Sequence, residues 1–173
     1  EVDDDMNKKI VQIFRAQGLD FREHIMHIMD LCRRYQPETV MIETNTFAKA
    51  FAMELKNISD FPVREFTMSR KKKQEIILNL QMNIDNHKII FPYGNEESQT
   101  VCRQLIQELE AFGINHNGKI EGVGAHDDMV ISLALANYAT KKFSDVFTLL
   151  DDEGIFNNGS PSIPYIGGGI YGI

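Results

Sequence analysis

The sequence predicts a domain of the α/β class, in which helices cover a sheet. Short apolar runs rich in β-branched residues alternate with segments of helical periodicity from residue 9 to residue 143, and such alternation is typical of this class. The chain has 173 residues, of which 43% are hydrophobic and 25% charged, so it can bury a core as one domain. We assign residues 1–150 to that domain and expect residues 151–173, which contain 6 of the 12 glycines, to form a flexible Gly/Pro-rich C-terminal tail.

Runs of β-branched and apolar residues predict the strands. The first occupies residues 9–16 and follows an acidic stretch, residues 3–7, that is typical of a hairpin turn. A turn at this point implies that the chain begins at the tail end of an earlier strand. Further strands are expected at 39–45, 63–66 and 89–92, and Pro92 cuts the last of them short.

Apolar residues spaced three or four positions apart predict the helices. Asp20 can cap the first of them, and Pro37 ends it. Helices are expected at 21–35, 46–57, 70–86, 97–111 and 126–143. The segment between the last two, residues 113–124, is polar and rich in glycine, so we expect a linker there, with a loop at residues 115–118.

Charge and cysteine content narrow the classes of function. With 18 basic and 25 acidic residues the formal net charge is −7, so any nucleic-acid contact has to be local or metal-assisted. No window approaches the roughly 18 unbroken apolar residues of a membrane span, and no signal segment opens the sequence. Cys32 and Cys102 have no metal-binding spacing and form no disulfide framework, which favours a reducing compartment. The Gly-Lys-Ser/Thr motif of P-loop ATPases is absent.

Glu43 is the first candidate for a functional residue. It directly follows the apolar residues 40–42, and open α/β sheets place their ligand crevice at the C-terminal ends of such strands. The alternative is a glutamate turned to solvent where the strand ends, followed by Asn45 as a helix cap. The residues alone leave both interpretations open.

His126, Asp127 and Asp128 run directly into an apolar helix. Capping and the helix dipole explain one aspartate at this position, but the histidine and the second aspartate require another reason. Hard cations such as Mg²⁺ and Mn²⁺ prefer carboxylate oxygens. If Glu43 faces the two aspartates, they form two sides of a site in which two metal ions, about 4 Å apart, clamp a phosphodiester.

Arg70, Lys71, Lys72 and Lys73 form a basic run at the start of a predicted helix. A run of this kind is commonly a solvated helix start. Four positive charges at a helix N-terminus oppose the helix dipole, however. This unfavourable placement favours contact with phosphate groups.

The order of these segments resembles that of the C-terminal nuclease domain of the large terminase subunit of tailed phages and herpesviruses. The segments that carry the resemblance are, in order, 41–45, 67–73, 89–92, 105–112 and 124–136, and the most specific of them begins Gly-Ala-His-Asp-Asp. The resemblance implies an RNase H-like fold, with a central mixed sheet flanked by helices, as in Holliday-junction resolvases and integrases. It also implies an endonuclease that uses two Mg²⁺ or Mn²⁺ ions to hydrolyse concatemeric double-stranded viral DNA.

The resemblance also implies roles for the candidate residues. Glu43 matches the acidic metal ligand on the middle strand of the family. The pair of aspartates matches the ligand on its last helix, with Asp128 as the direct metal ligand. Asp127 and His126 then orient that ligand or contact water and phosphate, and the basic residues 70–73 lie near DNA.

One ligand of the family has no counterpart in this sequence. The family places an acidic residue on an opening strand that precedes the hairpin. Here Asp3, Asp4 and Asp5 lie in the predicted turn itself, so we assign that ligand to none of them. The first strand of the sheet is therefore expected to be absent from this sequence, and catalytic competence of the chain depends on it.

The resemblance further implies partners and a location. The partners are double-stranded viral DNA, the portal protein, the small terminase subunit and the N-terminal ATPase domain of the same full-length protein, with no membrane. The location is the cytoplasm of the infected host cell, transiently at the procapsid portal. Two alternatives are a non-catalytic docking module that binds the packaging motor through residues 151–173 and its acidic surface, and a resolvase-type nuclease that acts on branched DNA.

Overall fold

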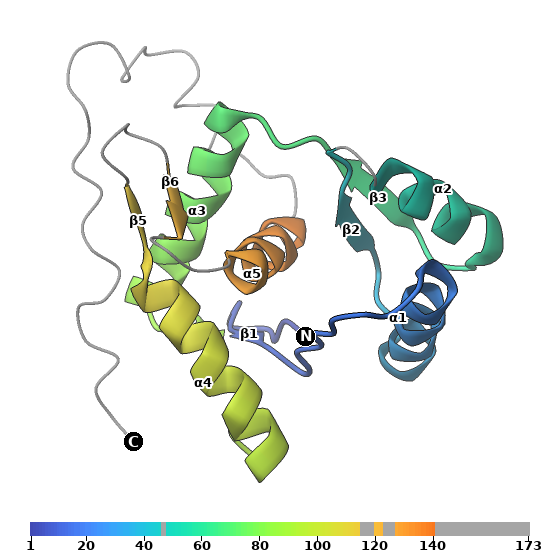
Figure 1. Ribbon diagram of the computed structural model, residues 1–173. Coiled ribbons are helices and arrows are strands. Elements are labelled where there is room, and N and C mark those ends of the chain that lie inside the picture. The colour runs from blue at the N-terminus through green and yellow to red at the C-terminus, as the bar shows by residue number, and fades with distance from the viewer. Residues whose placement is uncertain (46–47, 115–119, 123–126, 141–173) are drawn as a thin grey trace.

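The computed structural model describes residues 1–45, 48–114, 120–122 and 127–140 and has the α/β fold that the sequence predicts (Figure 1). The elements are β1 (Lys8–Lys9), α1 (Phe21–Tyr35), β2 (Val40–Glu43), α2 (Ala48–Ile58), β3 (Val63–Phe66), α3 (Arg70–Asp85), β4 (Ile89–Ile90), α4 (Glu96–Glu110), β5 (Phe112–Ile114), β6 (Ile120–Gly122) and α5 (Asp128–Ala139). The tail predicted for residues 151–173 lies outside the described residues. Within them, no helix is long and apolar enough to cross a membrane.

The helices begin where local capping residues stand. Asp20 caps α1 as predicted, because its side chain accepts from the backbone N–H of Glu23 at 2.9 Å and the Glu23 carboxylate accepts in return from Asp20. Asn95 forms the same reciprocal pair with Ser98 at the start of α4. Side-chain oxygens thus satisfy N–H groups that the first helical turn leaves without a partner, which is why the predicted starts of these helices lie within a residue of the observed ones.

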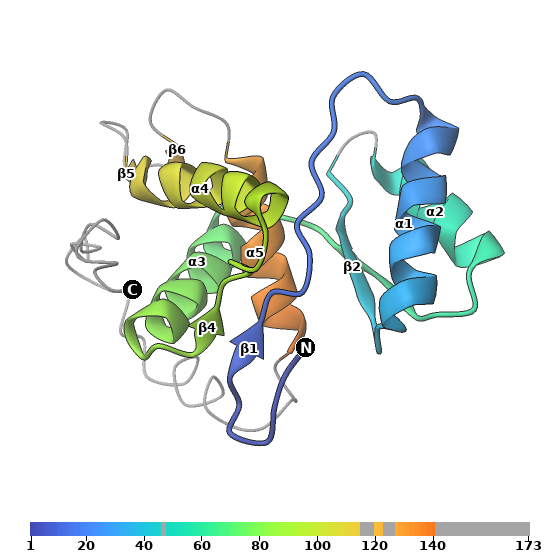
Figure 2. The ribbon, with the colours of Figure 1, turned by 90° about the horizontal axis from the view of Figure 1, so that it is seen from below.

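The strands run in mixed directions and pair two by two. β1 and β4 are parallel, β2 and β3 are parallel, and β5 and β6 are antiparallel. Among the described residues these pairs form three separate two-stranded sheets. The β2–β3 pair lies between α5 on one side and the helices α1 and α2 on the other (Figures 1 and 2).

The predicted hairpin turn is present, but the strand after it is shorter than expected. Val2 forms an antiparallel bridge with Lys8, and the Asp3 carboxylate accepts from the Asn7 N–H at 2.8 Å inside the turn. Of the predicted strand 9–16, only the first residue lies in β1. Its partner β4 has just two residues and Pro92 follows soon after, so the ladder has nothing to pair with farther along.

The segment expected to be a linker contains a hairpin instead. Its described parts form β5 and β6, in which Ile114 pairs with Ile120. The predicted loop at residues 115–118 lies outside the described residues. The sequence does carry a hairpin signal here, because Asn117 and Gly118 form a dipeptide typical of tight turns and lie between Ile114 and Ile120. The expectation of a linker was wrong. Each strand has only three residues, which is too few for an alternation of apolar and polar residues to reveal a strand in the sequence.

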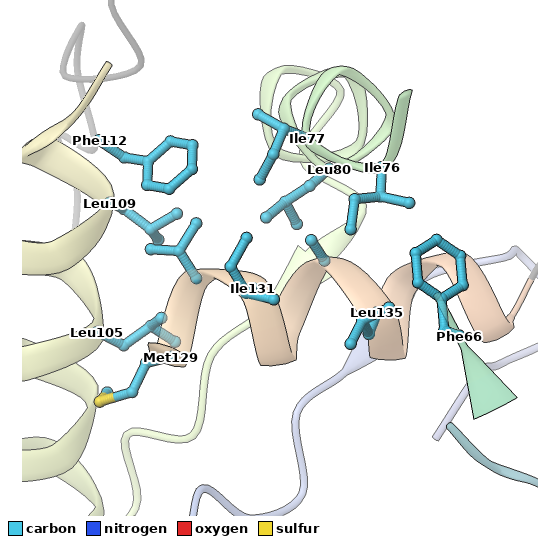
Figure 3. Packing of buried hydrophobic residues seen from close by; sticks show 12 residues of the cluster. Phe66, Ile76, Ile77, Leu80, Leu105, Leu109, Phe112, Met129, Ile131 and Leu135 are labelled. Atoms are coloured by element: carbon cyan, nitrogen blue, oxygen red, sulfur yellow. The ribbon is translucent and has the colours of Figure 1, made fainter. Parts of the chain in front are cut away.

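Helix α5 lies at the centre of the hydrophobic core (Figure 3). Its residues Val130 and Ala134 have no exposed surface at all. The side chains that cover it come from four neighbouring elements, and they are Phe66 in β3, Ile76, Ile77 and Leu80 in α3, Leu105 and Leu109 in α4, and Phe112 in β5. Cys32 and Cys102 are buried and free.

Truncation of Leu80 should measure the strength of this core. The side chain is 1% exposed, so Leu80→Ala should lower the free energy of unfolding by about 2–5 kcal/mol through lost burial and a cavity. Met82 lies on the same helix but is 57% exposed, and Met82→Ala should change the free energy by less than about 0.5 kcal/mol. Urea unfolding followed by circular dichroism measures both, and equal losses would contradict this packing.

Candidate functional site

Glu43 is the last residue of β2 and is half-buried. It stands opposite Phe66 in the β2–β3 register, and the N–H of Thr44 donates to the Phe66 carbonyl at 3.0 Å. Just beyond, the Asn45 side-chain amide donates to the Met68 carbonyl and accepts from the Met68 N–H, each at 3.0 Å. The chain that carries Glu43 is therefore held to its neighbour past the end of the strand.

The electrostatic surroundings of Glu43 bring the strand end and the start of α5 together. Burial raises the pKa of the Glu43 carboxyl above its ordinary value of 4.5. The ammonium of Lys73 opposes that rise in pKa, whereas the carboxylates of Asp127 and Asp128 add to it. Charges perturb a pKa in this way only when they lie close. The geometry agrees, since β2 packs against α5 and Lys73 in the first turn of α3 contacts Asp127, so the three segments lie in one region of the fold.

Asp127 occupies the N-cap position of α5 without acting as a side-chain cap. It forms no side-chain capping hydrogen bond. Its Oδ2 atom instead accepts from the Lys73 ammonium at 2.8 Å, and both side chains are mostly buried. Helix capping therefore does not account for the carboxylate of Asp127, which leaves a role in a functional site.

The basic run divides into two parts. Arg70 and Lys71 are exposed at the start of α3. Lys72 places its ammonium 5.3 Å from the centre of the Phe66 ring. Lys73, which the sequence grouped with the DNA contacts, is directed inward to Asp127 and is only 20% exposed. Spacing in the sequence could not separate Lys73 from the other three residues, because its inward direction depends on a contact with a residue 54 positions away.

Asp128 begins α5 and is exposed. It lines a cavity of about 350 Å³ and an adjoining one of about 290 Å³, and Phe14 and Arg15 line both of them as well. Asp128 therefore faces open space on the side of the chain that follows β1. His126, the third residue of the predicted motif, lies outside the described residues.

Sequence reasoning missed one charged group beside the site. Glu108 in α4 is 7% exposed, and its carboxylate accepts from Arg15 at 2.7 Å and from the backbone N–H of Met129 at 3.0 Å. The sequence contains a signal that could have identified Glu108. It is spaced three and four positions from Leu105 and Phe112, so it falls on the apolar face of the predicted helix. A charged residue on such a face needs a partner inside the fold.

The donor set suits a hard divalent cation. Glu43, Asp127 and Asp128 offer carboxylate oxygens, which Mg²⁺ and Mn²⁺ prefer, and their mutual repulsion favours a bound cation. Lys73 supplies one positive charge in the same place. In the described part of the chain, no group of three His, Cys, Asp or Glu side chains is arranged to hold a metal ion. The carboxylates thus fit a metal by the chemistry of their oxygen atoms.

Comparison with known proteins identifies first the class of the domain, which is RNase H-like, and then its family. A family model described as the terminase RNase H-like domain matches residues 3–138. The chain belongs to this family, which confirms the resemblance and the fold class predicted from the sequence.

The chain is also similar to a solved structure, the large terminase nuclease of the thermophilic phage G20c with bound cobalt. The two share 22% identity with a TM-score of 0.59, and the match covers 71% of this chain. It spans 64% of the length of that structure. At this identity the likeness establishes the fold alone. No curated protein matches the chain.

Neutralising Glu43 should stabilise the metal-free protein. Because its pKa is raised, mainly by burial, the folded state loses stability as the pH rises above 4.5, where the unfolded chain releases this proton first. Glu43→Gln removes the unfavourable charge, so Tm in EDTA at pH 7 should rise by about 2–4 °C. The gain should shrink as the pH approaches 4, where the carboxyl is protonated in both states.

Glu65→Gln is the matched control, measured by the same thermal scans. The pKa of Glu65 is lowered by a hydrogen bond from Lys56, so its charged form is the favoured one. Its neutralisation should leave Tm unchanged or lower it. A lower Tm for Glu43→Gln at pH 7 would contradict the electrostatics described for the site.

Proposed function

We propose that this chain is the metal-dependent endonuclease domain of a viral DNA-packaging terminase. It hydrolyses phosphodiester bonds of concatemeric double-stranded DNA. One observation carries this function: in a chain of the terminase RNase H-like domain family, β2, which ends at Glu43, packs against α5, which begins at Asp128. Carboxylates placed at the ends of a strand and a helix are the type of site that phosphodiester hydrolysis by two metal ions requires.

Position and family membership support a role for each candidate residue. We infer that Glu43 and Asp128 are the direct ligands of two Mg²⁺ or Mn²⁺ ions, and that Asp127 orients Asp128 or adds a third carboxylate. His126 is assigned to the same group from the sequence. These carboxylates would hold the cations, which would supply activation of water and stabilisation of the charge on the phosphate. The bound cobalt of the G20c terminase nuclease supports the use of divalent metal.

Lys73 has a different role from the outer basic residues. Its ammonium contacts Asp127 and lies 5.6 Å from the centre of the Phe112 ring, so it offsets part of the negative charge of the site. A phosphodiester approaching the carboxylates then meets less repulsion. Arg70 and Lys71 lie at the exposed start of α3 and are the residues that we assign to the DNA backbone.

The working context is a packaging motor. We infer that the domain acts on double-stranded viral DNA together with a portal protein, a small terminase subunit and an ATPase domain of the same full-length protein. Its place of action is the cytoplasm of an infected host cell, at the procapsid portal. These partners explain how a chain with a net charge of −7 meets DNA, because a motor that holds the substrate replaces long-range attraction.

Cleavage of a supercoiled plasmid tests the enzyme directly. The chain should nick and linearise the plasmid in Mn²⁺ or Mg²⁺ and leave it intact in EDTA. Glu43→Ala and Asp128→Ala should each lower the rate at least about 100-fold, because each removes a carboxylate of the site. Glu65→Ala, which removes a glutamate outside the site, should cut at the wild-type rate.

Each other outcome identifies an alternative. Absence of cutting in every metal would refute the claim that the chain itself is an enzyme, a result expected both for a docking module and for a nuclease domain without the family's opening-strand ligand. Cutting in EDTA would exclude the metal mechanism. Cutting of a synthetic four-way junction in strong preference to linear duplex would favour the resolvase-type nuclease.

Salt dependence of DNA binding tests the division of the basic run. The double variant Arg70→Ala and Lys71→Ala should weaken binding to any duplex sequence and reduce the slope of log K against log salt by about 2. Fluorescence anisotropy in EDTA measures binding without cleavage. Arg33→Ala with Arg34→Ala, in the last turn of α1, removes the same charge elsewhere and should leave the slope unchanged. Equal slopes for both double variants would refute the assignment.

A further inference from the structure

We propose, on the basis of the function proposed above, that Glu108 is a positioning residue for the carboxylates at the start of α5. It touches neither metal nor substrate. It acts by fixing the first turn of the helix that carries Asp127 and Asp128. Glu108 belongs to α4 and lies 21 residues before its partner Met129 in the sequence.

Helix α5 needs an acceptor from outside itself. The first N–H groups of a helix have no partner within it, and the side chain of the N-cap residue commonly accepts from one of them. Here the N-cap residue Asp127 makes no such bond, because its carboxylate contacts Lys73. The Oε2 atom of Glu108 takes that role and accepts from the Met129 N–H at 3.0 Å.

The negative charge of Glu108 strengthens this arrangement. A carboxylate at a helix N-terminus interacts favourably with the helix dipole, and more so when water is excluded. Glu108 is 7% exposed, so its bond to the helix is shielded from solvent. As a result, Asp127 remains available to the site while the helix start stays capped.

Arg15 completes the unit from the opposite side. Its Nη1 atom donates to Glu108 Oε1 at 2.7 Å and lies 3.5 Å from the Met129 sulfur. Arg15 also lines both cavities that Asp128 lines. One buried carboxylate therefore connects the chain after β1, the helix α4 and the residue next to Asp128. A displacement of Glu108 would move the aspartates relative to Glu43.

A merely structural ion pair would behave differently from a positioning residue. Loss of a structural pair lowers Tm but leaves the affinity for metal unchanged in the molecules that remain folded. Loss of a positioning residue weakens metal binding beyond its effect on Tm, because residues behind the ligands set their geometry. The two readouts are therefore Tm in EDTA and the Mn²⁺ concentration at half-saturation.

The test compares Glu108→Ala and Glu108→Gln with Asn137→Ala in the full 173-residue chain. Asn137 is the matched control, since it is buried at the other end of α5 and bonded to Lys8 and Asn79. Isothermal titration with Mn²⁺ alone measures half-saturation. We expect an increase of about tenfold for Glu108→Ala and about threefold for Glu108→Gln, which keeps an acceptor for Met129. Asn137→Ala should lower Tm without changing half-saturation.

The outcomes separate this inference from the function on which it rests. Wild-type half-saturation in both Glu108 variants would overturn the positioning role, whatever their Tm. If Glu108→Ala does not fold, Glu108→Gln decides, because a Gln variant that binds Mn²⁺ as tightly as the wild type is incompatible with the role. If the wild-type chain binds no Mn²⁺, or Asp128→Ala binds it equally well, the proposed site is wrong and this inference falls with it.

Discussion

Burial of α5 on several sides is the constraint on which the rest of the structure depends. A helix that is apolar nearly all round has to lie inside the fold, and here α3, α4, β3 and β5 provide its cover. The polar residues of this helix are Asp128 at its start, Ser132 on its exposed side, and Asn137 and Tyr138 near its end, where Asn137 belongs to a buried network. At the start of α5, the charged residues Asp127 and Asp128 lie directly next to the hydrophobic core.

This position explains why the site is electrostatically unfavourable without a cation. Because β2 packs against α5, the carboxylate of Glu43 is partly removed from water, and the negative charges of Asp127 and Asp128 raise its pKa further. A single ammonium, from Lys73, offsets only part of that charge. Unfavourable charge of this kind is common where a site is built to bind. The four groups come from three elements that a shared core holds in place.

The sequence predicts the local features of this protein well. Helical periodicity and capping residues such as Asp20 locate the helices, and the alternation of elements predicts the class. Glu43 and the aspartates are candidates on sequence alone, because carboxylates at the end of an apolar strand and at the start of an apolar helix are visible without any structure. The family match then agrees with the order of those segments.

Features that depend on distant contacts could not be predicted. The inward direction of Lys73 depends on Asp127, the role of Glu108 depends on Arg15 and Met129, and the length of β1 depends on the length of its partner. The hairpin of β5 and β6 is too short for period-two alternation to distinguish it from a loop. Each of these misses concerns a pairing between segments, not the conformation of a segment by itself.

The side-chain amide of Asn45 has a consequence for how Glu43 is presented. Its two hydrogen bonds with the backbone of Met68 imitate one more rung of the β2–β3 ladder. The ends of short strands ordinarily fray, and a carboxylate on a fraying end samples many orientations. Because these two hydrogen bonds hold the end of β2, its conformational entropy is already lost when the chain folds. A ligand that arrives later finds the backbone of Glu43 already ordered and does not have to order it.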